Sequence, residues 1–322
     1  MIFENRISLG ELSQLVQCIR QEIGRIIVGQ EEMINLLLVA LLADGHVLIE
    51  GVPGVAKTLT AKLLAQLVAV KFARIQFTPD LMPSDVLGTV IFNQKTADFE
   101  FKKGAIFTNL VLIDEINRAP AKTQSALFEV MEERQISIDG TTYPMVPPFM
   151  VLATQNPIEQ EGTYPLPEAQ LDRFLFKIEV HYPTLSQETQ ILEKAQQRQG
   201  DITRVDLQPV LTAEKLLQFR QKVQEIHVEN PLLHYIAQIV HHTRQHPALF
   251  LGASPRASLA ILRASKAWAA MQGRDFVSPD DIKFVCLPVL AHRVALTPEK
   301  EMEGISTRTV LQQVIQKVEV PR

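Results

Sequence analysis

A glycine-rich segment that ends in a lysine and a threonine carries the clearest chemistry in this sequence. It runs Gly51-Val52-Pro53-Gly54-Val55-Ala56-Lys57-Thr58 and lies between an apolar run and a helical pattern. In a loop of this kind the backbone N–H groups surround phosphate oxygens, and the following helix points its positive end at them. We therefore expect Lys57 to reach the β- and γ-phosphates of a nucleotide, and the Thr58 hydroxyl to bind Mg²⁺.

Ala56 departs from the usual pattern of this loop, Gly-x-x-x-x-Gly-Lys, which has a second glycine there. Alanine is compatible with the position if the residue keeps a negative φ, as it would when leading into a helix. The sequence thus predicts a right-handed backbone at Ala56. A chance glycine-proline turn before a helix is the alternative, and the placement of Lys57-Thr58 between strand and helix argues against it.

Two acidic residues, Asp114 and Glu115, end a second apolar run about sixty residues after this loop. A strand with this ending fits a Walker B element, in which Asp114 holds the metal ion through water. Glu115 would then orient and polarise the attacking water. Two carboxylates at a strand end can also be solvated loop residues, but their position after a phosphate-binding loop favours the catalytic interpretation.

The elements that position these residues alternate in the manner of an α/β fold. Short apolar runs predict a parallel sheet of five strands, at His46–Glu50, Phe72–Phe77, Leu110–Asp114, Phe149–Thr154 and Phe174–Glu179. Helical periodicity predicts two helices in the first ~45 residues and two more at Lys57–Val70 and Lys122–Glu133.

Two stretches interrupt this alternation, and a change of pattern follows it. Gly88–Phe107 and Gln135–Met145 each have the signature of a β-hairpin, the second with an Asp139-Gly140 turn. After Pro183 the strand patterns stop and helical patterns follow to the end of the chain. We therefore predict an α/β nucleotide-binding domain over residues 1–182 and an all-α lid domain over residues 183–322.

Composition limits the classes of function. A formal net charge of −4 and a pI near 6.1 give no support to general nucleic-acid binding. The longest apolar run, Leu36–Ala43, has eight residues, too few to cross a bilayer. The first residues, Met1 to Arg6, show no signal peptide. Cys18 and Cys286 fit no metal or redox spacing, which indicates reduced cysteines in a cytoplasmic protein.

Five motifs in a fixed order resemble those of the MoxR family of AAA+ ATPases, and a sixth in the helical part extends the resemblance over nearly the whole chain. They are Glu50 to Thr58, Ile113-Asp114-Glu115-Ile116-Asn117-Arg118-Ala119, Met131-Glu132-Glu133-Arg134-Gln135, Ala153-Thr154-Gln155-Asn156-Pro157, Leu166 to Phe174, and Ser254-Pro255-Arg256-Ala257. Alanine before the loop lysine is itself common in that family, so Ala56 supports the resemblance.

The resemblance implies roles for three more residues. Asn156 matches sensor 1, which helps to position the hydrolytic water; its alternative role is a turn residue before Pro157. Arg173 matches an arginine finger that reaches the nucleotide of a neighbouring subunit; its alternative is a local ion pair with Asp172 or Glu168. Arg256 matches the lid arginine called sensor 2, and would otherwise be an exposed residue in the first turn of a helix.

The remaining site assignments also come from the resemblance. Arg118 follows the two acids and is a further candidate for a subunit interface, while Val28-Gly29-Gln30 resembles the segment that contacts the nucleotide base. A turn between helices explains the latter segment equally well. The expected nucleotide-binding residues are Val28, Gly29, Gly51, Pro53, Gly54, Val55, Ala56, Lys57, Thr58, Leu59 and Asp114, and the expected Mg²⁺ ligands are Thr58 and Asp114.

The function that the resemblance implies is ATP hydrolysis that drives protein remodelling or maturation, with metal-cofactor insertion or complex assembly as possible tasks. The implied partners are further copies in a homo-oligomeric, hexameric ring, a von Willebrand factor A domain protein and a client protein. Two alternatives are a DNA or RNA translocase and a nucleotide-gated binding module without significant turnover. The hairpins disfavour nucleic acid, because the second has no Lys or Arg and the first has only Lys95, Lys102 and Lys103.

Overall fold

A parallel sheet of five strands forms the centre of the computed structural model, which describes residues 9–156, 163–198 and 207–321. The strand order is β2-β5-β8-β1-β9, and all neighbours are parallel. The strands are β1 (His46–Gly51), β2 (Phe72–Gln76), β5 (Leu110–Asp114), β8 (Met150–Gln155) and β9 (Phe174–Val180). Each lies within two residues of the prediction at both ends, so the expected α/β fold is confirmed.

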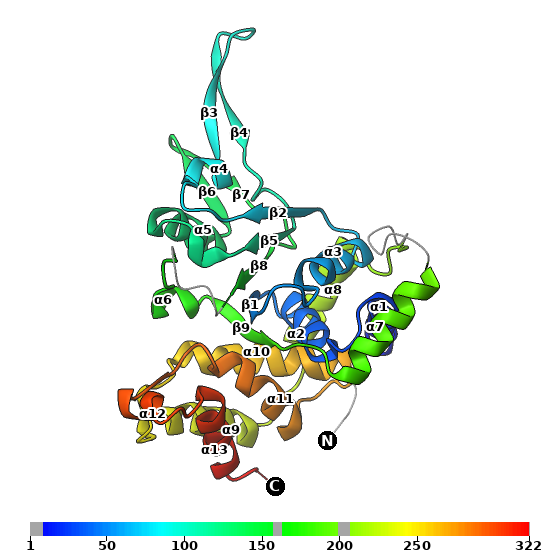
Figure 1. Ribbon diagram of the computed structural model, residues 1–322, viewed down its shortest axis with the longest axis vertical. Coiled ribbons are helices and arrows are strands. Elements are labelled where there is room, and N and C mark those ends of the chain that lie inside the picture. Colours follow the sequence, from blue (N-terminus) through cyan, green and yellow to red (C-terminus); the bar gives the residue numbers. More distant parts are fainter. Residues whose placement is uncertain (1–8, 157–162, 199–206, 322) are drawn as a thin grey trace.

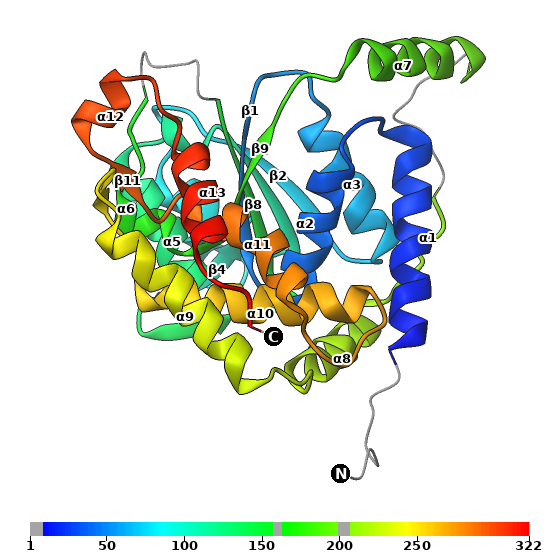
Figure 2. The ribbon, with the colours of Figure 1, turned by 90° about the horizontal axis from the view of Figure 1, so that it is seen from below.

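Helices cover both faces of this sheet (Figures 1 and 2). Successive side chains of β5 lie on opposite faces of the sheet. Leu110 and Leu112 pack in one buried cluster, and Val111 and Ile113 pack in the other. This is the period of two that a strand imposes on its side chains. The helices of this α/β part are α1 (Gly10–Ile26), α2 (Glu31–Leu42), α3 (Lys57–Leu67), α4 (Pro83–Leu87), α5 (Ala121–Glu133) and α6 (Glu168–Leu171), with a 3₁₀ turn, η1 (Ile116–Arg118).

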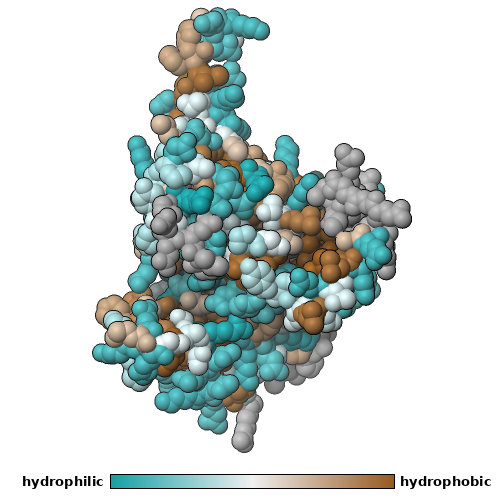
Figure 3. Space-filling model, viewed as in Figure 1, coloured by the Kyte–Doolittle hydropathy of each residue, from teal (hydrophilic) through white to brown (hydrophobic). Residues whose placement is uncertain are grey.

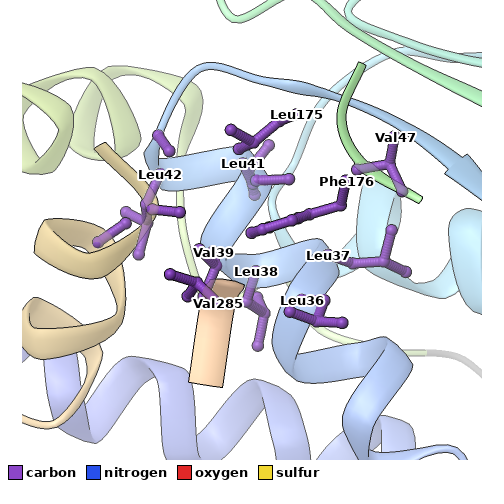
Figure 4. Packing of buried hydrophobic residues seen from close by; sticks show 14 of the residues in the cluster. Leu36, Leu37, Leu38, Val39, Leu41, Leu42, Val47, Leu175, Phe176 and Val285 are labelled. Atoms are coloured by element: carbon purple, nitrogen blue, oxygen red, sulfur yellow. The ribbon is translucent and has the colours of Figure 1, made fainter. Parts of the chain in front are cut away.

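Helix α2 joins the sheet to the C-terminal helices. Nine of its twelve residues are buried, because it is apolar on nearly all sides. Figure 4 shows its leucines between Phe176 of β9 and Val285 of the C-terminal part. One continuous apolar core therefore runs through both parts of the chain and fixes the C-terminal helices against the sheet.

Both expected hairpins are present. The first pairs β3 (Gly88–Asn93) with β4 (Asp98–Lys103), and the second pairs β6 (Gln135–Ile138) with β7 (Thr141–Pro144). The β3–β4 hairpin projects from the body, and Figure 3 shows apolar side chains on it. Phe92 and Phe99 are exposed there and contact each other edge to face, with ring centres 5.4 Å apart.

The C-terminal part is helical, as expected, with one exception. Its helices are α7 (Leu185–Arg198), α8 (Ala213–Gln224), α9 (Asn230–Gln245), α10 (Pro255–Met271), α11 (Pro279–Leu290), α12 (Pro298–Met302) and α13 (Thr307–Lys317). Two short strands, β10 (Leu249–Leu251) and β11 (Ala295–Leu296), pair antiparallel within it. The expectation that strands stop after Pro183 was wrong at these two places, because segments this short give no readable alternation.

Within the described residues, no helix is both long enough and apolar enough to span a membrane. The N-terminal residues Met1 to Arg6, and Pro157 after Asn156, lie outside the described ranges.

Candidate active site

The carboxyl edge of the sheet, where the parallel strands end, carries the residues of the first two motifs. Strand register aligns Gln76 with Asp114 and Glu50 with Gln155, so polar residues from four strands meet there. A cavity of about 380 Å³ opens at this edge. Its lining comes from the glycine-rich loop, α3, and the ends of three strands: Pro53, Gly54, Ala56, Lys57, Thr58, Leu59, Arg74, Gln76, Asp114, Glu115, Thr154 and Asn156.

The glycine-rich loop connects β1 to α3 in the expected context. The Lys57 side chain folds back over the loop, and its Nζ donates a hydrogen bond to the Gly51 carbonyl at 2.5 Å. Partial burial lowers the pKa of Lys57 from its ordinary value, although the carboxylates of Asp114 and Glu115 act in the opposite direction. The two expected loop residues outside the lining are Gly51, which ends β1, and Val55, which is buried in the core.

Ala56 has a φ of +61°, so the prediction of a right-handed backbone was wrong. The residue turns the chain from the loop into α3, and its carbonyl accepts hydrogen bonds from the Thr60 backbone N–H and hydroxyl, both at 2.9 Å. The loop geometry therefore imposes at Ala56 the conformation for which glycine is the usual residue. A left-handed alanine costs about 1–2 kcal/mol, which the loop and α3 must offset.

Asp114 is buried at the end of β5 and is held by two neighbouring strands. Arg74 Nε of β2 lies 2.6 Å from Asp114 Oδ2, and the Thr154 hydroxyl of β8 donates to Oδ1 at 3.2 Å. A cationic group thus already contacts the carboxylate that we expect to hold a metal ion. With Thr58 lining the same cavity, the donor set of carboxylate and hydroxyl oxygens fits Mg²⁺.

Glu115 extends from the same strand end into the cavity. Gln76 donates to Glu115 Oε2 at 2.8 Å, and Arg118 forms an ion pair with that oxygen at 3.2 Å. The backbone of Glu115 is left-handed, with a φ of +56°, and its N–H donates to the Thr154 hydroxyl. Non-glycine residues with a left-handed backbone cluster at functional sites, where the surrounding structure offsets the cost of the strain.

Arg74 and Gln76 are residues that the sequence analysis missed. They occupy alternate positions on β2 and contact Asp114 and Glu115 respectively. A polar pair at a spacing of two, on the strand just before the acids, was the available signal.

Asn156 is buried and lines the cavity together with Glu115. Val28 and Gly29 lie in the turn between α1 and α2, outside the described lining of this cavity. Gly29 has a φ of +77° and packs so closely on the Gln187 side chain of α7 that a Cβ would clash with it. This segment therefore contacts α7, whether or not it contacts a base.

Arg173 and Arg256 lie at the other end of the strands, which we call the amino edge of the sheet. They line a second cavity, of about 570 Å³, together with His46, the first residue of β1. The glycine-rich loop follows the last residue of the same strand. In Figure 2, β1 rises to its turn into α3 at the top, whereas α10, which carries Arg256, runs along the bottom. One chain therefore does not bring the two arginines to its own loop.

Arg173 forms its ion pair with Glu132 of α5, at 2.6 Å, and not with Asp172 or Glu168 as the alternative interpretation expected. Asp172 is instead held by Arg293, whose Nε lies 2.6 Å from its carboxylate. Arg293 is buried, and it also donates to the Phe174 carbonyl at 2.6 Å. Asp172 and Arg293 thus connect the segment after α11 to the segment before β9.

Positive charge predominates at the amino edge. The second cavity is lined by five arginines against three carboxylates, namely Arg134, Arg173, Arg256, Arg263, Arg293, Asp44, Glu132 and Asp172. His46 adds no charge at neutral pH, because burial and the nearby Arg134 lower its pKa to about 3. The surplus of two positive charges suits an anion.

A P-loop at the carboxyl edge, two acids on the adjacent strand and a helical second part are the features of a AAA+ ATPase with its lid. Residues 46–176 match the model of the ATPase family associated with various cellular activities (AAA), and residues 241–314 match the AAA lid domain. The fold and the site thus define the class.

Relatives narrow this class to one family. The chain is 47% identical to Chaperone MoxR1 of Mycobacterium tuberculosis, covering 94% of this chain and 81% of that one. It is also 47% identical to the uncharacterised protein YeaC of Bacillus subtilis, covering 94% and 93%. The crystal structure of a proposed ATPase from Cytophaga hutchinsonii has a TM-score of 0.88 at 43% identity and covers 97% of both chains. The chain belongs to the MoxR family of AAA+ ATPases.

Proposed function

We propose that the protein hydrolyses ATP at sites shared between neighbouring copies in a ring, and uses the energy to remodel or mature other proteins. The observation that carries this proposal is the separation of its site residues. The P-loop and the acids lie at the carboxyl edge of the sheet, whereas Arg173 and Arg256 line a cavity at the amino edge. A second copy that presents its amino edge to the P-loop of the first would complete the site.

At the carboxyl edge, each residue has a role that follows from its position. The loop N–H groups and Lys57 bind the phosphates, while Thr58 and Asp114 hold Mg²⁺, which neutralises charge on the phosphate oxygens when bound. Glu115 accepts a proton from the attacking water, and Asn156, in the same cavity, orients that water.

At the amino edge, Arg173 and Arg256 of the neighbouring copy supply positive charge to the transferring phosphate. A head-to-tail contact of this kind joins two different surfaces, and repeated rotation closes it into a ring. We propose a hexamer, as the family resemblance implies. Arg118, three residues after Glu115 and paired with it, lies at the edge that such a neighbour would cover.

Protein remodelling is supported by the relative named Chaperone MoxR1 and by the projecting β3–β4 hairpin. Its exposed Phe92 and Phe99 suit contact with a protein surface. We propose a von Willebrand factor A domain protein as partner and cofactor insertion or complex assembly as the task. The free cysteines, Cys18 and Cys286, fit a cytoplasmic location.

Glu115→Gln tests the hydrolytic role directly. The amide cannot accept a proton from water, so we expect turnover to fall ~10²–10⁴-fold while ATP affinity stays unchanged. Glu133→Gln, an exposed position of the same acidic type on α5, is the matched control. Steady-state phosphate release and titration with a fluorescent ATP analogue measure the two quantities, and EDTA should abolish wild-type turnover. Near wild-type turnover by Glu115→Gln would remove that residue from the mechanism.

The same variant tests the proposed partners. Glu115→Gln should hold ATP and retain a client in a pulldown, whereas Lys57→Ala, which lacks the phosphate contact, should not. Proteins that the two variants retain equally would not be ATP-dependent clients.

A further inference from the structure

Glu132 lies between the two arginines of the amino edge. Its Oε2 forms an ion pair with Arg173 Nη1 at 2.6 Å, and its Oε1 accepts a hydrogen bond from Arg256 Nη2 at 3.2 Å. The three residues come from α5, from the start of β9 and from α10, and 124 positions separate Glu132 from Arg256 along the chain. One carboxylate thus links the two arginines, and it uses a different oxygen for each.

The other two carboxylates of this cavity are engaged by other arginines: Asp44 pairs with Arg134 and Arg220, and Asp172 pairs with Arg293. Asp172 accepts from the buried Arg293 at 2.6 Å and from the Ser254 hydroxyl at 3.2 Å. Its Oδ2 also forms an ion pair with Arg256 Nη1, at 4.0 Å, which is longer than a hydrogen bond. Among the described residues, Glu132 is therefore the group that holds Arg256 and Arg173 together.

Two guanidinium groups that approach each other repel, and the cavity already carries a surplus of positive charge. A carboxylate between them offsets this repulsion and fixes both in one orientation. We propose that Glu132 is a positioning residue that holds Arg173 and Arg256 as one unit for the nucleotide of the neighbouring copy. This inference rests on the proposed function, and adds to it a residue that acts through the two arginines.

The contacts of Arg173 leave it able to act while it is held. Nη1 forms the ion pair with Glu132 and donates a hydrogen bond to the Phe128 carbonyl at 2.7 Å. Both contacts use Nη1, and Nε is buried with no hydrogen-bond partner in the described structure, so the guanidinium retains hydrogen-bonding capacity. Holding an arginine by one nitrogen reduces the entropy lost when another binds.

Glu132→Gln is the decisive substitution, because it replaces one of the two acceptor oxygens by a donor that faces a guanidinium. We expect turnover to fall ~10–100-fold, the range that small misplacement of a catalytic group produces, with nucleotide affinity unchanged within about twofold. The Glu132→Gln/Arg173→Ala double variant should be no slower than Arg173→Ala alone, since both changes disable the same unit. Glu133→Gln, next to it and exposed, serves as the matched control and should keep wild-type turnover.

Mixing experiments distinguish positioning from a general structural effect. Glu132→Gln mixed with Lys57→Ala should regain activity, because an intact pocket can then lie beside an intact pair of arginines. Glu132→Gln mixed with Arg173→Ala should not, because no copy in that mixture offers a functional pair. Size and melting temperature verify folding; Glu132→Asp, which keeps two acceptors on a shorter side chain, should lie between wild type and Glu132→Gln and serves if the glutamine variant does not fold.

Four outcomes would overturn this inference. Wild-type turnover by Glu132→Gln, recovery when it is mixed with Arg173→Ala, or lost ring assembly in place of lost turnover would each contradict the positioning role. If wild type is active, Arg173→Ala is inactive and Glu132→Gln keeps wild-type turnover, the positioning role of Glu132 is overturned while the proposed function stands. A wild-type protein without ATPase activity would overturn the proposed function, and this inference with it.

Discussion

The two edges of the sheet differ in how their site residues come together. At the carboxyl edge, Gly51 to Thr58 form one continuous loop, and Asp114 and Glu115 are adjacent in the chain. At the amino edge, Glu132, Arg173 and Arg256 come from three separate elements, and tertiary packing alone brings them together. A local segment can be recognised as a motif, whereas a site assembled from distant segments requires the fold.

The two edges also differ in charge. The carboxyl edge presents Asp114 and Glu115 together with Lys57, a mixture that suits a metal ion and phosphates. The amino edge has more arginines than carboxylates and lines its cavity with them. This difference in charge is what the proposed function expects of two edges that are complementary halves of one site for phosphoryl transfer. The substitutions below test this relation, in order of decreasing expected effect.

Arg173→Ala should give the largest effect. An arginine finger contributes ~10³–10⁵ in turnover, so the variant should bind ATP and be nearly inactive. Lys57→Ala should be inactive for the opposite reason, since its own pocket is defective. In an equal mixture roughly a quarter of interfaces pair an Arg173→Ala pocket with an intact Arg173, which sets a bound on recovered activity.

Phosphate release before and after mixing measures this recovery, and native mass spectrometry must first show mixed rings. Substantial turnover by Arg173→Ala alone, or by a strictly monomeric protein, would mean that the amino edge takes no part in the reaction.

Lys57→Ala tests the carboxyl edge alone. The variant loses a charged donor to the phosphates, an interaction of about 1.5–3 kcal/mol, so affinity for an ATP analogue should fall ~10–100-fold. Lys62→Ala, an exposed lysine on the same helix, is the matched control. Fluorescence titration checks both, and equal affinities for the two variants would place the nucleotide elsewhere.

The same contrast between local segments and distant segments brought together by packing separates the features that the sequence predicts from those that it does not. The five strands of the central sheet were predicted within two residues. The Asp139-Gly140 turn was recognised because Asp-Gly favours the positive φ that both residues have in the structure. These features depend on local periodicity and turn chemistry. The P-loop and the Walker B acids were recognised for the same reason, since each lies in one short segment.

The features that the sequence did not predict depend on packing or on backbone geometry. Asp172 was a plausible partner for Arg173 by proximity, but Arg293, from the segment after α11, pairs with it instead. Arg74 contacts Asp114 across neighbouring strands, which requires knowledge of strand order. The φ of Ala56 follows from the loop as a whole, not from the preference of alanine.

His46, at the amino edge, should make the free energy of unfolding depend on pH. Its Nδ1 accepts from the Val151 N–H at 2.9 Å and its Nε2 contacts the Met131 carbonyl at 3.1 Å, so the folded protein holds it neutral. Its pKa is about 3 when folded and near 6.5 when unfolded, because burial and nearby arginines disfavour the charged ring. Between these values the unfolded chain binds the extra proton, so stability is full above pH 6.5 and falls as pH decreases.

The expected slope is about 1.4 kcal/mol per pH unit below pH 6. His46→Gln keeps one donor and one acceptor without a titratable group, and should lack this component. Urea unfolding of both proteins from pH 7 to pH 5 gives the difference, and parallel pH profiles would show that His46 does not titrate on unfolding.

Ala56→Gly, at the carboxyl edge, should have the smallest effect and the opposite sign. Ala56 is left-handed, with a φ of +61°, a conformation that glycine adopts without the steric cost of a Cβ. Glycine makes the unfolded chain more flexible, which offsets part of this gain, so the net increase in unfolding free energy should be about 1 kcal/mol. Nucleotide affinity should hardly change, since the backbone N–H groups keep their positions.

Two further alanines make this test specific to backbone conformation. Ala69 has a φ of +51° in an exposed turn after α3, so Ala69→Gly should also stabilise. Ala195 is exposed within α7, where glycine costs roughly 0.5–1 kcal/mol, so Ala195→Gly should destabilise. Urea unfolding at a constant m-value compares the three variants. If Ala56→Gly destabilised the protein as Ala195→Gly does, the left-handed loop geometry would be wrong, and with it the account of how the P-loop turns into α3.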